Sequence, residues 1–267
     1  MATAKDIHVA PISSEAARAL VKRLHYSGKV AQNSQLHFGV FLNGRLEGAM
    51  QFGPSLDKRK IQGLVHGTGW NDFLELNRMA FSEALPRNSE SRALGIAFRL
   101  IRKHYQHIEW VISFADGTQC GDGTIYRASG FVLTGIKENS TIIRLSDGTI
   151  AANLTYSKGV HILKSGGAKK PEGAERLPGF QLRYIFFLNP AARDRLAVPI
   201  LPFSKIEEMG ASMYRGERMT RGKEQDAWHP QALGGATPTT TLQASEAGEP
   251  GDQPDSGGAT PTRTLQT

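Results

Sequence analysis

The chain has 267 residues and a net charge of +7; residues 230–267 carry −3, which leaves +10 for residues 1–229. A single cysteine, Cys120, excludes an intramolecular disulfide framework and fits a reducing cytoplasm. No apolar run approaches the ~20 residues of a membrane span, and no signal-peptide pattern opens the chain. We therefore expect no membrane partner, and the basic body favours a polyanion, although solubility alone would also explain the charge.

The N-terminal third predicts a strand, a helix and a hairpin. Asp6–Val9 is typical of a short strand, and Ser13 or Ser14 can cap a helix whose apolar residues recur at helical spacing: Ala17, Leu20, Val21 and Leu24. Gly28 suits the C-terminal end of this helix.

The hairpin is predicted over His37–Gly53, because Asn43-Gly44 supplies the positive φ angles of a two-residue turn. The following segment, Pro54–Trp70, is basic and glycine-rich. We expect it to form a long surface loop, and such loops are usually functional or mobile.

The chain is organised around residues 75–131. Phe73–Phe81 predicts a strand, Pro86–Ser91 a polar turn, and the residues up to Tyr105 a helix with apolar positions at helical spacing. Trp110–Asp116 predicts a second strand, and residues 117–123 form a glycine-rich loop that leads into a short helix ending near Phe131. Two strands joined by a helical crossover should be parallel, with ligands at their carboxyl ends.

The C-terminal half predicts further strands. We expect an antiparallel pair over Phe131–Ile136 and Thr141–Leu145, an Asp147-Gly148 turn into Thr149–Tyr156, and a last strand at Leu182–Leu188. Ser165–Arg176 is expected to be a mobile basic loop.

The tail has a different composition. Gly234–Gln243 returns, with one replacement, at Gly257–Gln266 as a 23-residue repeat. Its glycine, proline and threonine cannot bury enough apolar surface to fold, so we expect disorder. The predicted organisation is a catalytic domain over residues 1–190, an extension over 191–229 and a disordered tail over 230–267, in an α/β fold with a mixed central sheet flanked by helices.

Three features could carry chemistry. Arg92–Ala97 fits the pattern Arg/Gln-x-x-Gly-x-Gly/Ala, in which free amides at a helix start face a pyrophosphate and Gly95 permits close approach. Tyr126, four residues before Gly130-Phe131, could protonate a leaving thiolate because its pKa of about 10 is close to that of a thiol. It could equally pack its ring and hydrogen-bond locally.

Asp116 ends the second parallel strand, where a carboxylate is a site candidate. The alternative is a turn-forming role. Asp116 ranks ahead of Asp122 and Glu75 as a base. Asn77 and Arg78 interrupt an apolar strand, so their polar side chains need a partner or a ligand.

Cys120 is not expected to be a nucleophile, because the sequence places no base next to it. A metal is not predicted from ligand spacing among the candidate side chains: His25, His37, His66, Asp116 and Asp122.

The arrangement resembles the GNAT fold of acyl-CoA N-acyltransferases, through the Arg92–Ala97 loop and through Tyr126 before Gly-Phe. It resembles more closely the bacteriophage Mom family of DNA adenine modification proteins, over residues 16–156. The motifs that carry this likeness are His25–Lys29, Phe38–Phe41, Glu75–Met79, Pro86–Ser91, Phe114–Gly117 and Ile125-Tyr126.

The resemblance implies conversion of the exocyclic amine of adenine in phage DNA to a carbamoylmethylamine, which blocks host restriction nucleases. It implies double-stranded DNA as partner and the host cytoplasm as location. The implied functional residues are His25, Tyr26, Arg78, Asp116 and Tyr126 for catalysis, with Ser91, Arg92 and Gly95 for the cofactor. The implied donor is acetyl-CoA or another CoA- or aminoacyl-type molecule, with a metal ion such as iron as a further candidate.

Plain acyl transfer does not explain this product, because it yields an amide rather than an alkylated amine. Adenine N6 is inaccessible within a duplex, so the base must be flipped into a pocket, where Tyr26 or Trp70 could stack on it unless they belong to the core. Two other functions remain open: an ordinary N-acetyltransferase for a small amine or a protein, and a non-catalytic DNA-binding protein.

Overall fold

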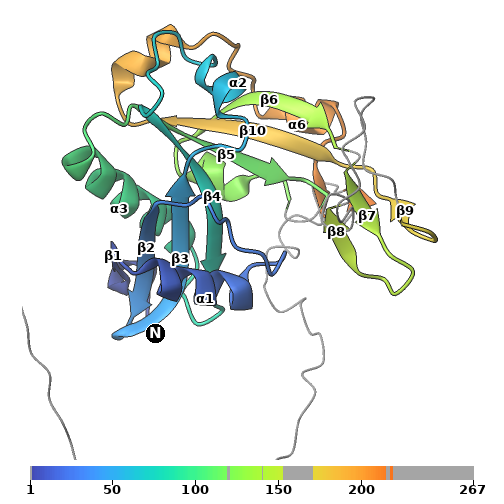
Figure 1. Ribbon diagram of the computed structural model, residues 1–267, viewed down its shortest axis with the longest axis horizontal. Coiled ribbons are helices and arrows are strands. Elements are labelled where there is room, and N and C mark those ends of the chain that lie inside the picture. The colour runs from blue at the N-terminus through green and yellow to red at the C-terminus, as the bar shows by residue number, and fades with distance from the viewer. Residues whose placement is uncertain (1, 119–120, 140, 153–170, 215–216, 219–267) are drawn as a thin grey trace, which may run out of the picture. The chain divides into compact units, whose positions relative to one another are not determined.

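A seven-stranded mixed sheet forms the centre of the molecule (Figure 1). The computed structural model describes residues 2–118, 121–139, 141–152, 171–214 and 217–218. β4 and β5 are parallel, and the other neighbours are antiparallel. In spatial order the strands are β1 (His8–Pro11), β2 (Leu36–Leu42), β3 (Arg45–Gly53), β4 (Phe73–Phe81), β5 (Trp110–Asp116), β10 (Phe180–Phe187) and β6 (Val132–Glu138).

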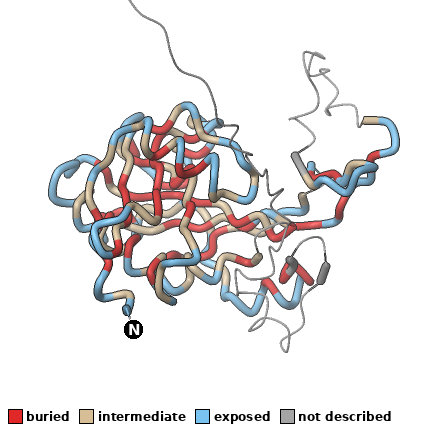
Figure 2. The backbone as a smooth tube through the Cα atoms, turned by 90° about the horizontal axis from the view of Figure 1, so that it is seen from below, coloured by how far each residue is buried: buried red, intermediate tan, exposed pale blue. Residues whose placement is uncertain are grey.

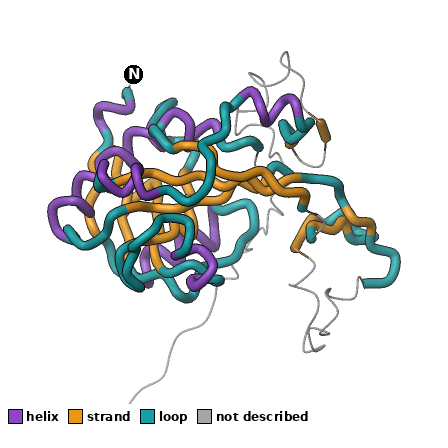
Figure 3. Tube along the Cα trace, turned by 90° about the horizontal axis from the view of Figure 1, so that it is seen from above, coloured by secondary structure: helices purple, strands orange, loops and turns teal. Residues whose placement is uncertain are grey.

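Helices cover both sides of this sheet (Figure 3). The longest, α3 (Ser89–His104), buries Leu94, Phe98 and Ile101 against one face. α1 (Ser14–Leu24) packs on β3 and β4 of the opposite face, where its small and apolar residues meet Ala49 and Ala80. The mixed central sheet flanked by helices that the sequence predicts is confirmed.

The capping and turn residues of the N-terminal third predicted the first helix and the hairpin correctly. The Ser13 hydroxyl accepts a hydrogen bond from the Ala16 amide (3.1 Å) and caps α1. Asn43 and Gly44 have φ angles of 51° and 78°, as the tight hairpin requires. The helix ends earlier than Gly28 suggests, since His25 is already extended and Gly28 belongs to the following turn.

The expected long surface loop over 54–70 is wrong in part. It contains α2 (Lys58–Gln62), and its apolar residues Ile61, Leu64 and Val65 are buried against Phe73 and Trp110. Their spacing of three and four residues is one helical turn, but the surrounding charges and glycines masked it. Figure 2 shows buried chain chiefly along the central strands.

The strand pairing of the C-terminal half also differs from expectation. Phe131–Ile136 does not pair with Thr141–Leu145; β6 pairs instead with β10, which enters between β5 and β6. β7 (Ile142–Arg144) joins a small sheet with β8 (Ile150–Ala152) and β9 (Glu175–Arg176). A partner that comes from about 50 residues further along the chain leaves no local signal. Residues 153–170, including the first half of the expected basic loop, lie outside the described residues.

The described part of the extension packs on the same body. η2 (Pro190–Arg195) contributes the buried Ala192, and Leu196 forms a bridge with Val65. The other short elements are η1 (Ala4–Asp6), α4 (Thr124–Ala128), α6 (Ser204–Glu208), β11 (Met213–Tyr214) and β12 (Glu217–Arg218). The chain divides into units 1–230 and 231–267, and the repeat tail lies outside the described residues. In the described part, no helix is long and apolar enough to cross a bilayer.

One hydrogen bond ties the segment after α2 to the central sheet. The Trp110 indole donates to the Thr68 hydroxyl (3.1 Å), which itself donates to the Val65 carbonyl (2.7 Å). Thr68→Val keeps the shape but leaves a buried indole N–H unpaired. We expect it to lower the free energy of unfolding by about 1–3 kcal/mol, as measured by urea denaturation. Thr68→Ser, which retains the hydroxyl, should lose less; an equal or smaller loss for valine would contradict this role.

Candidate active site

β4 and β5 pair with each other only at their beginnings. The parallel register runs from Phe73 opposite Trp110 to Glu75 opposite Ile112. Beyond this point β4 continues alongside β3, and β5 continues alongside β10 as far as Asp116. The two strands therefore stop pairing at their carboxyl halves, where the sequence places its candidate residues.

A bulge in β4 accompanies this separation. The register with β3 shifts so that Arg78 lies opposite Gln51 and Leu76 opposite Phe52, which leaves Asn77 as the extra residue. The buried Asn77 side chain accepts from the Ser34 hydroxyl (2.9 Å). Because of the extra residue, Glu75 and Arg78 face the same side of the sheet, the side covered by α1 and α2.

His25 and Tyr26 follow the end of α1 and stack on each other with ring centroids 4.2 Å apart. Burial lowers the pKa of the His25 imidazole to about 4, and the positive charge of Arg78 acts in the same direction. The Ser27 amide donates to His25 Nδ1 (3.2 Å), so this nitrogen is the acceptor. The neutral ring then carries its proton on Nε2, where it can serve as a donor.

Arg78 is fixed by the backbone around it. Its Nε donates to the Lys29 carbonyl (2.9 Å) and a terminal nitrogen donates to the Asn77 carbonyl (2.6 Å). These bonds join the turn after α1 to the β4 bulge. The structure therefore brings His25, Tyr26 and Arg78 together, as the sequence motifs suggested.

Glu75 is a further partly buried carboxylate of this region. Burial raises the pKa of the Glu75 carboxyl, while Ser55, Asn77 and Arg78 act in the opposite direction. It lies where the parallel pairing ends, beside Arg78 and on the same sheet face. Its position inside an apolar strand, rather than at a strand tip, was the signal that could have found it.

Asp116 ends β5 opposite Gln181. By strand alternation its side chain shares the face of Ile112 and Phe114, which is the face of Glu75 and Arg78. Its carboxylate accepts from the Thr118 amide (3.0 Å). Asp116 therefore makes the contact expected of a turn-forming residue, through its Oδ1 atom.

Tyr126 lies on the opposite face of the sheet. Its ring packs against Phe131 and Tyr184, each with centroids 5.3 Å away. Tyr184 of β10 donates to the Asp122 carbonyl (2.5 Å), and burial raises the pKa of its phenol. Asp122 forms an ion pair with Arg127 (2.7 Å), so it holds the loop after β5 together.

The start of α3 differs from expectation. Arg92 is the fourth residue of the helix and its amide already donates to the Asn88 carbonyl (3.2 Å), while Gly95 is the seventh. The first turn is formed by Ser89, Glu90 and Ser91 after Asn88, whose φ is 67°. Amides without helical acceptors belong to this turn. The pyrophosphate site at Ser91, Arg92 and Gly95 stays a prediction.

Two further observations bear on this position. Burial raises the pKa of the Glu90 carboxyl, which reduces its charge next to an anion. The pKa of the Asp6 carboxyl is lowered chiefly because the carboxylate accepts a hydrogen bond from the Thr3 amide. The positive charge of Arg92 makes a smaller contribution in the same direction, so Arg92 is close enough to η1 to act on it. The Ser91 hydroxyl donates to the Asn88 carbonyl (3.3 Å) within this first turn.

The chain was compared with known proteins. The model of the Mom protein family matches residues 6–205. Methylcarbamoylase Mom of Escherichia phage Mu is 39% identical over 199 residues, which cover 72% of this chain and 80% of that protein. The chain belongs to the Mom protein family. The match extends beyond the motifs recognised in the sequence, through η2 to α6.

Solved structures with similar folds are acetyltransferases. The ribosomal-protein-S18-alanine N-acetyltransferase of Escherichia coli has a TM-score of 0.40 at 12% identity, covering 68% of this chain and 94% of that chain. An acetyltransferase of the GNAT family from Streptococcus pneumoniae has a TM-score of 0.37 at 12% identity, covering 68% and 98%.

The metal suggested by the Mom resemblance was tested against the side chains present. Among the described residues, no three histidine, cysteine, aspartate or glutamate side chains gather, so His25, His37, His66, Asp116 and Asp122 do not form a shared centre. Cys120 lies outside the described residues.

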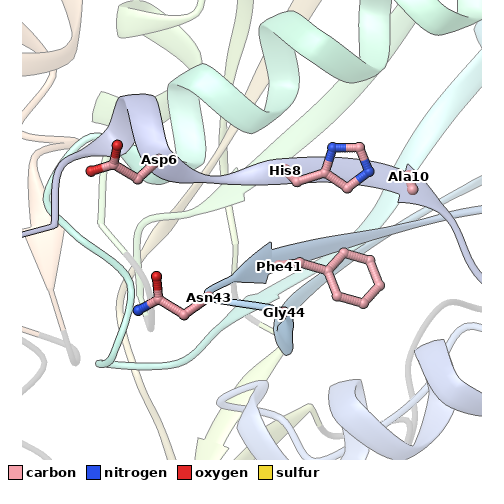
Figure 4. Close-up of a pocket in the computed structure, with 6 residues that line it drawn as sticks. All are labelled: Asp6, His8, Ala10, Phe41, Asn43 and Gly44. Carbon is pink, nitrogen blue, oxygen red and sulfur yellow. The ribbon is translucent and has the colours of Figure 1, made fainter.

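A surface pocket lies away from these residues. It is formed by η1, β1 and the β2–β3 turn, and its lining is Asp6, His8, Ala10, Phe41, Asn43 and Gly44 (Figure 4). None of the site residues predicted for this Mom-family chain lines it. Arg78 and Asp116 belong to the halves of β4 and β5 that no longer pair with each other.

His25 should make stability depend on pH. Its pKa is about 4 in the fold against an ordinary 6.5. The unfolded chain therefore binds more protons between these values, and stability falls as pH decreases through this window. We expect wild type to lose up to about 2 kcal/mol more than His25→Gln between pH 7.5 and pH 5. Urea denaturation at both pH values measures this.

The exposed His66 provides the control. His66→Gln makes the same substitution at an exposed position, and Glu75 and Glu90 titrate in every variant, so their effects cancel. Identical losses for wild type and His25→Gln would contradict the burial of a neutral His25.

Proposed function

We propose that this protein attaches a carbamoylmethyl group to the exocyclic N6 amine of adenine in double-stranded DNA. The observation that carries the proposal is membership of the Mom family, with 39% identity to a methylcarbamoylase over most of both chains. The basic body, +10 over residues 1–229, supports a DNA substrate. Protection of phage DNA from restriction in the host cell is the biological role that follows.

The candidate residues are divided between the two faces of the sheet, which suggests that each face binds one of the two reactants. His25, Tyr26, Glu75, Arg78 and Asp116 occupy the face of α1 and α2. Tyr126 and Ser91 belong to the other face, with α3 and α4. We infer that a flipped adenine approaches from the first face and the donor from the second. They would meet where β4 and β5 no longer pair.

The role proposed for each side chain follows from its protonation and its hydrogen bonds. The neutral His25 offers an Nε2–H donor to the ring nitrogens of adenine, and Tyr26 offers a ring for stacking. Arg78 is already fixed by two carbonyls and supplies positive charge beside the reacting atoms. Asp116 accepts the N6 proton as the new carbon–nitrogen bond forms.

The donor implied by the resemblance is a CoA- or aminoacyl-type molecule. A hydroxyl at Ser91 and the free amides of the first turn of α3 fit an anionic group such as a pyrophosphate. In the alternative acetyl transfer, an amine would displace the thiolate of a CoA thioester, and Tyr126 would give the departing sulfur its proton. The carbamoylmethyl product requires a donor that also brings the amide nitrogen, which an aminoacyl-type molecule can supply.

The proposed activity is tested by mass spectrometry of nucleosides from plasmid DNA after the protein has been expressed in a bacterial host. Deoxyadenosine heavier by a carbamoylmethyl group is expected. Unmodified adenine together with acetylation of a small amine by the purified protein would favour an ordinary N-acetyltransferase. Tight DNA binding with no modification would favour a binding protein.

Asp116→Asn separates catalysis from turn formation. The amide oxygen can still accept from the Thr118 amide, so the loop should keep its shape, but the basic carboxylate is gone. We expect a normal melting temperature, normal DNA binding and modified adenine reduced by about 100-fold or more. Asp147→Asn is the matched control, because this exposed aspartate likewise accepts from the amide two residues on, that of Thr149 (2.8 Å). Near-normal modification by Asp116→Asn would assign Asp116 to the turn alone.

Tyr126→Phe tests the proton donor. The phenyl ring retains the packing on Phe131 and Tyr184, so stability should be unchanged. Loss of the hydroxyl should reduce the modified adenine about 100-fold. Tyr105→Phe, in an exposed position after α3, should behave like wild type. Full activity of Tyr126→Phe would remove this hydroxyl from the reaction.

A further inference from the structure

Leu56 is an aliphatic side chain left almost wholly in water. It is 96% exposed, whereas Trp70 and Tyr26 are 52% and 51% exposed. A single exposed leucine is common on protein surfaces and needs no explanation by itself. Its anchoring, its charged neighbours and its place beside the candidate site distinguish this one.

The chain on both sides of Leu56 is firmly held. The Pro54 carbonyl accepts from Asn33 (2.6 Å) and from Asn77 of the β4 bulge (3.5 Å). Ser55 is 5% exposed, and Gly53 lies opposite Glu75 in the sheet. After Leu56, Ile61 of α2 is buried against Phe73. Leu56 therefore projects from a fixed segment next to Glu75.

The residues that follow Leu56 are positively charged. Lys58, Arg59 and Lys60 follow it, against one acid, Asp57. Lys58 is engaged, since its ammonium lies 4.7 Å from the Trp70 ring centre and donates to Asn71 (3.1 Å). Within the described part of the chain, Arg59 and Lys60 are exposed and form no ion pair with a carboxylate.

An exposed leucine next to cationic side chains without carboxylate partners suits the groove of a DNA duplex better than a protein surface. Extruding a base breaks its stacking and leaves a gap between neighbouring base pairs. Apolar side chains, leucine among them, can insert between base steps and occupy such gaps. The rings of Tyr26 and Trp70 are engaged with His25 and Lys58, whereas Leu56 is almost fully exposed.

We propose that Leu56 inserts into the DNA stack in the place vacated by the target adenine, while Arg59 and Lys60 hold the flanking phosphates. The proposal rests on the proposed function, because it deepens the account of how adenine reaches the site. Leu56 is a positioning residue: it keeps the base outside the helix and takes no part in the bond-forming step.

The test compares two substrates. One is a duplex with a paired adenine in a context found modified in plasmid DNA; the other carries the same adenine opposite an abasic site. Leu56→Ala should lose about tenfold or more of the modification rate on the paired duplex, a barrier change of about 1.4 kcal/mol. On the abasic duplex it should stay within about twofold of wild type, because little stacking has to be broken. Leu56→Met should retain the rate on both.

Ile200→Ala, another exposed aliphatic position at 41% exposure, is the matched control and should behave as wild type. All variants should share one melting temperature, since Leu56 buries almost nothing. A second measurement does not need the chemistry: duplexes with 2-aminopurine in place of several adenines should fluoresce more strongly with wild type, and less so with Leu56→Ala.

The outcomes separate the two proposals. If wild type modifies adenine and Leu56→Ala is unimpaired on the paired duplex, or equally impaired on both substrates, insertion by Leu56 is wrong and the adenine modification stands. If wild type modifies no DNA but raises 2-aminopurine fluorescence in a Leu56-dependent manner, the insertion stands and the chemistry is wrong. No fluorescence change with wild type would overturn the insertion.

Discussion

The site depends on the point at which β4 and β5 cease to pair. Three residue pairs join the two strands, and the extra residue Asn77 then bends β4 along β3 instead. The bend is held by a close approach that only glycine permits. A Cβ at Gly53 would lie 2.6 Å from the Asn33 carbonyl and 2.8 Å from the Asn77 side chain. The same Asn77 amide group reaches both Ser34 and Pro54, so one buried side chain fixes the turn after α1 and the segment before α2.

The electrostatics of the region follow from this geometry. The bulge puts Arg78 and Glu75 on one face, and α1 delivers His25 above them. Burial keeps the imidazole neutral and raises the pKa of the Glu75 carboxyl, so each group is held towards its uncharged form. Arg78 remains the fixed positive charge, with two of its nitrogens bonded to backbone carbonyls. Such an arrangement suits a planar, neutral base better than a charged amine.

The opposite face has a different character. Tyr126 belongs to an aromatic cluster in which Phe98 stacks on Phe186 at 4.2 Å, and Tyr184 ties the loop after β5 to β10. β10 therefore does more than complete the sheet: it fixes both the Asp116 end of β5 and the helix that carries Tyr126. A sheet whose two faces meet at one gap in strand pairing allows two reactants to approach from opposite sides.

The sequence by itself determined the elements whose signals are local. The sequence indicated the Ser13 cap, the Asn43-Gly44 turn, the periodicity of α3 and the β4–α3–β5 crossover, and the crossover implied parallel strands with ligands at their carboxyl ends. Motif likeness singled out His25 and Tyr26, and Tyr126 was indicated both by its position before Gly130-Phe131 and by the resemblance. Tertiary structure alone decided the rest. The insertion of β10 beside β5, the bulge at Asn77 and the burial of α2 depend on partners distant in sequence. The pKa values of His25 and Glu75 depend on burial. The start of α3 at Ser89 depends on where the backbone turns, here at the left-handed Asn88.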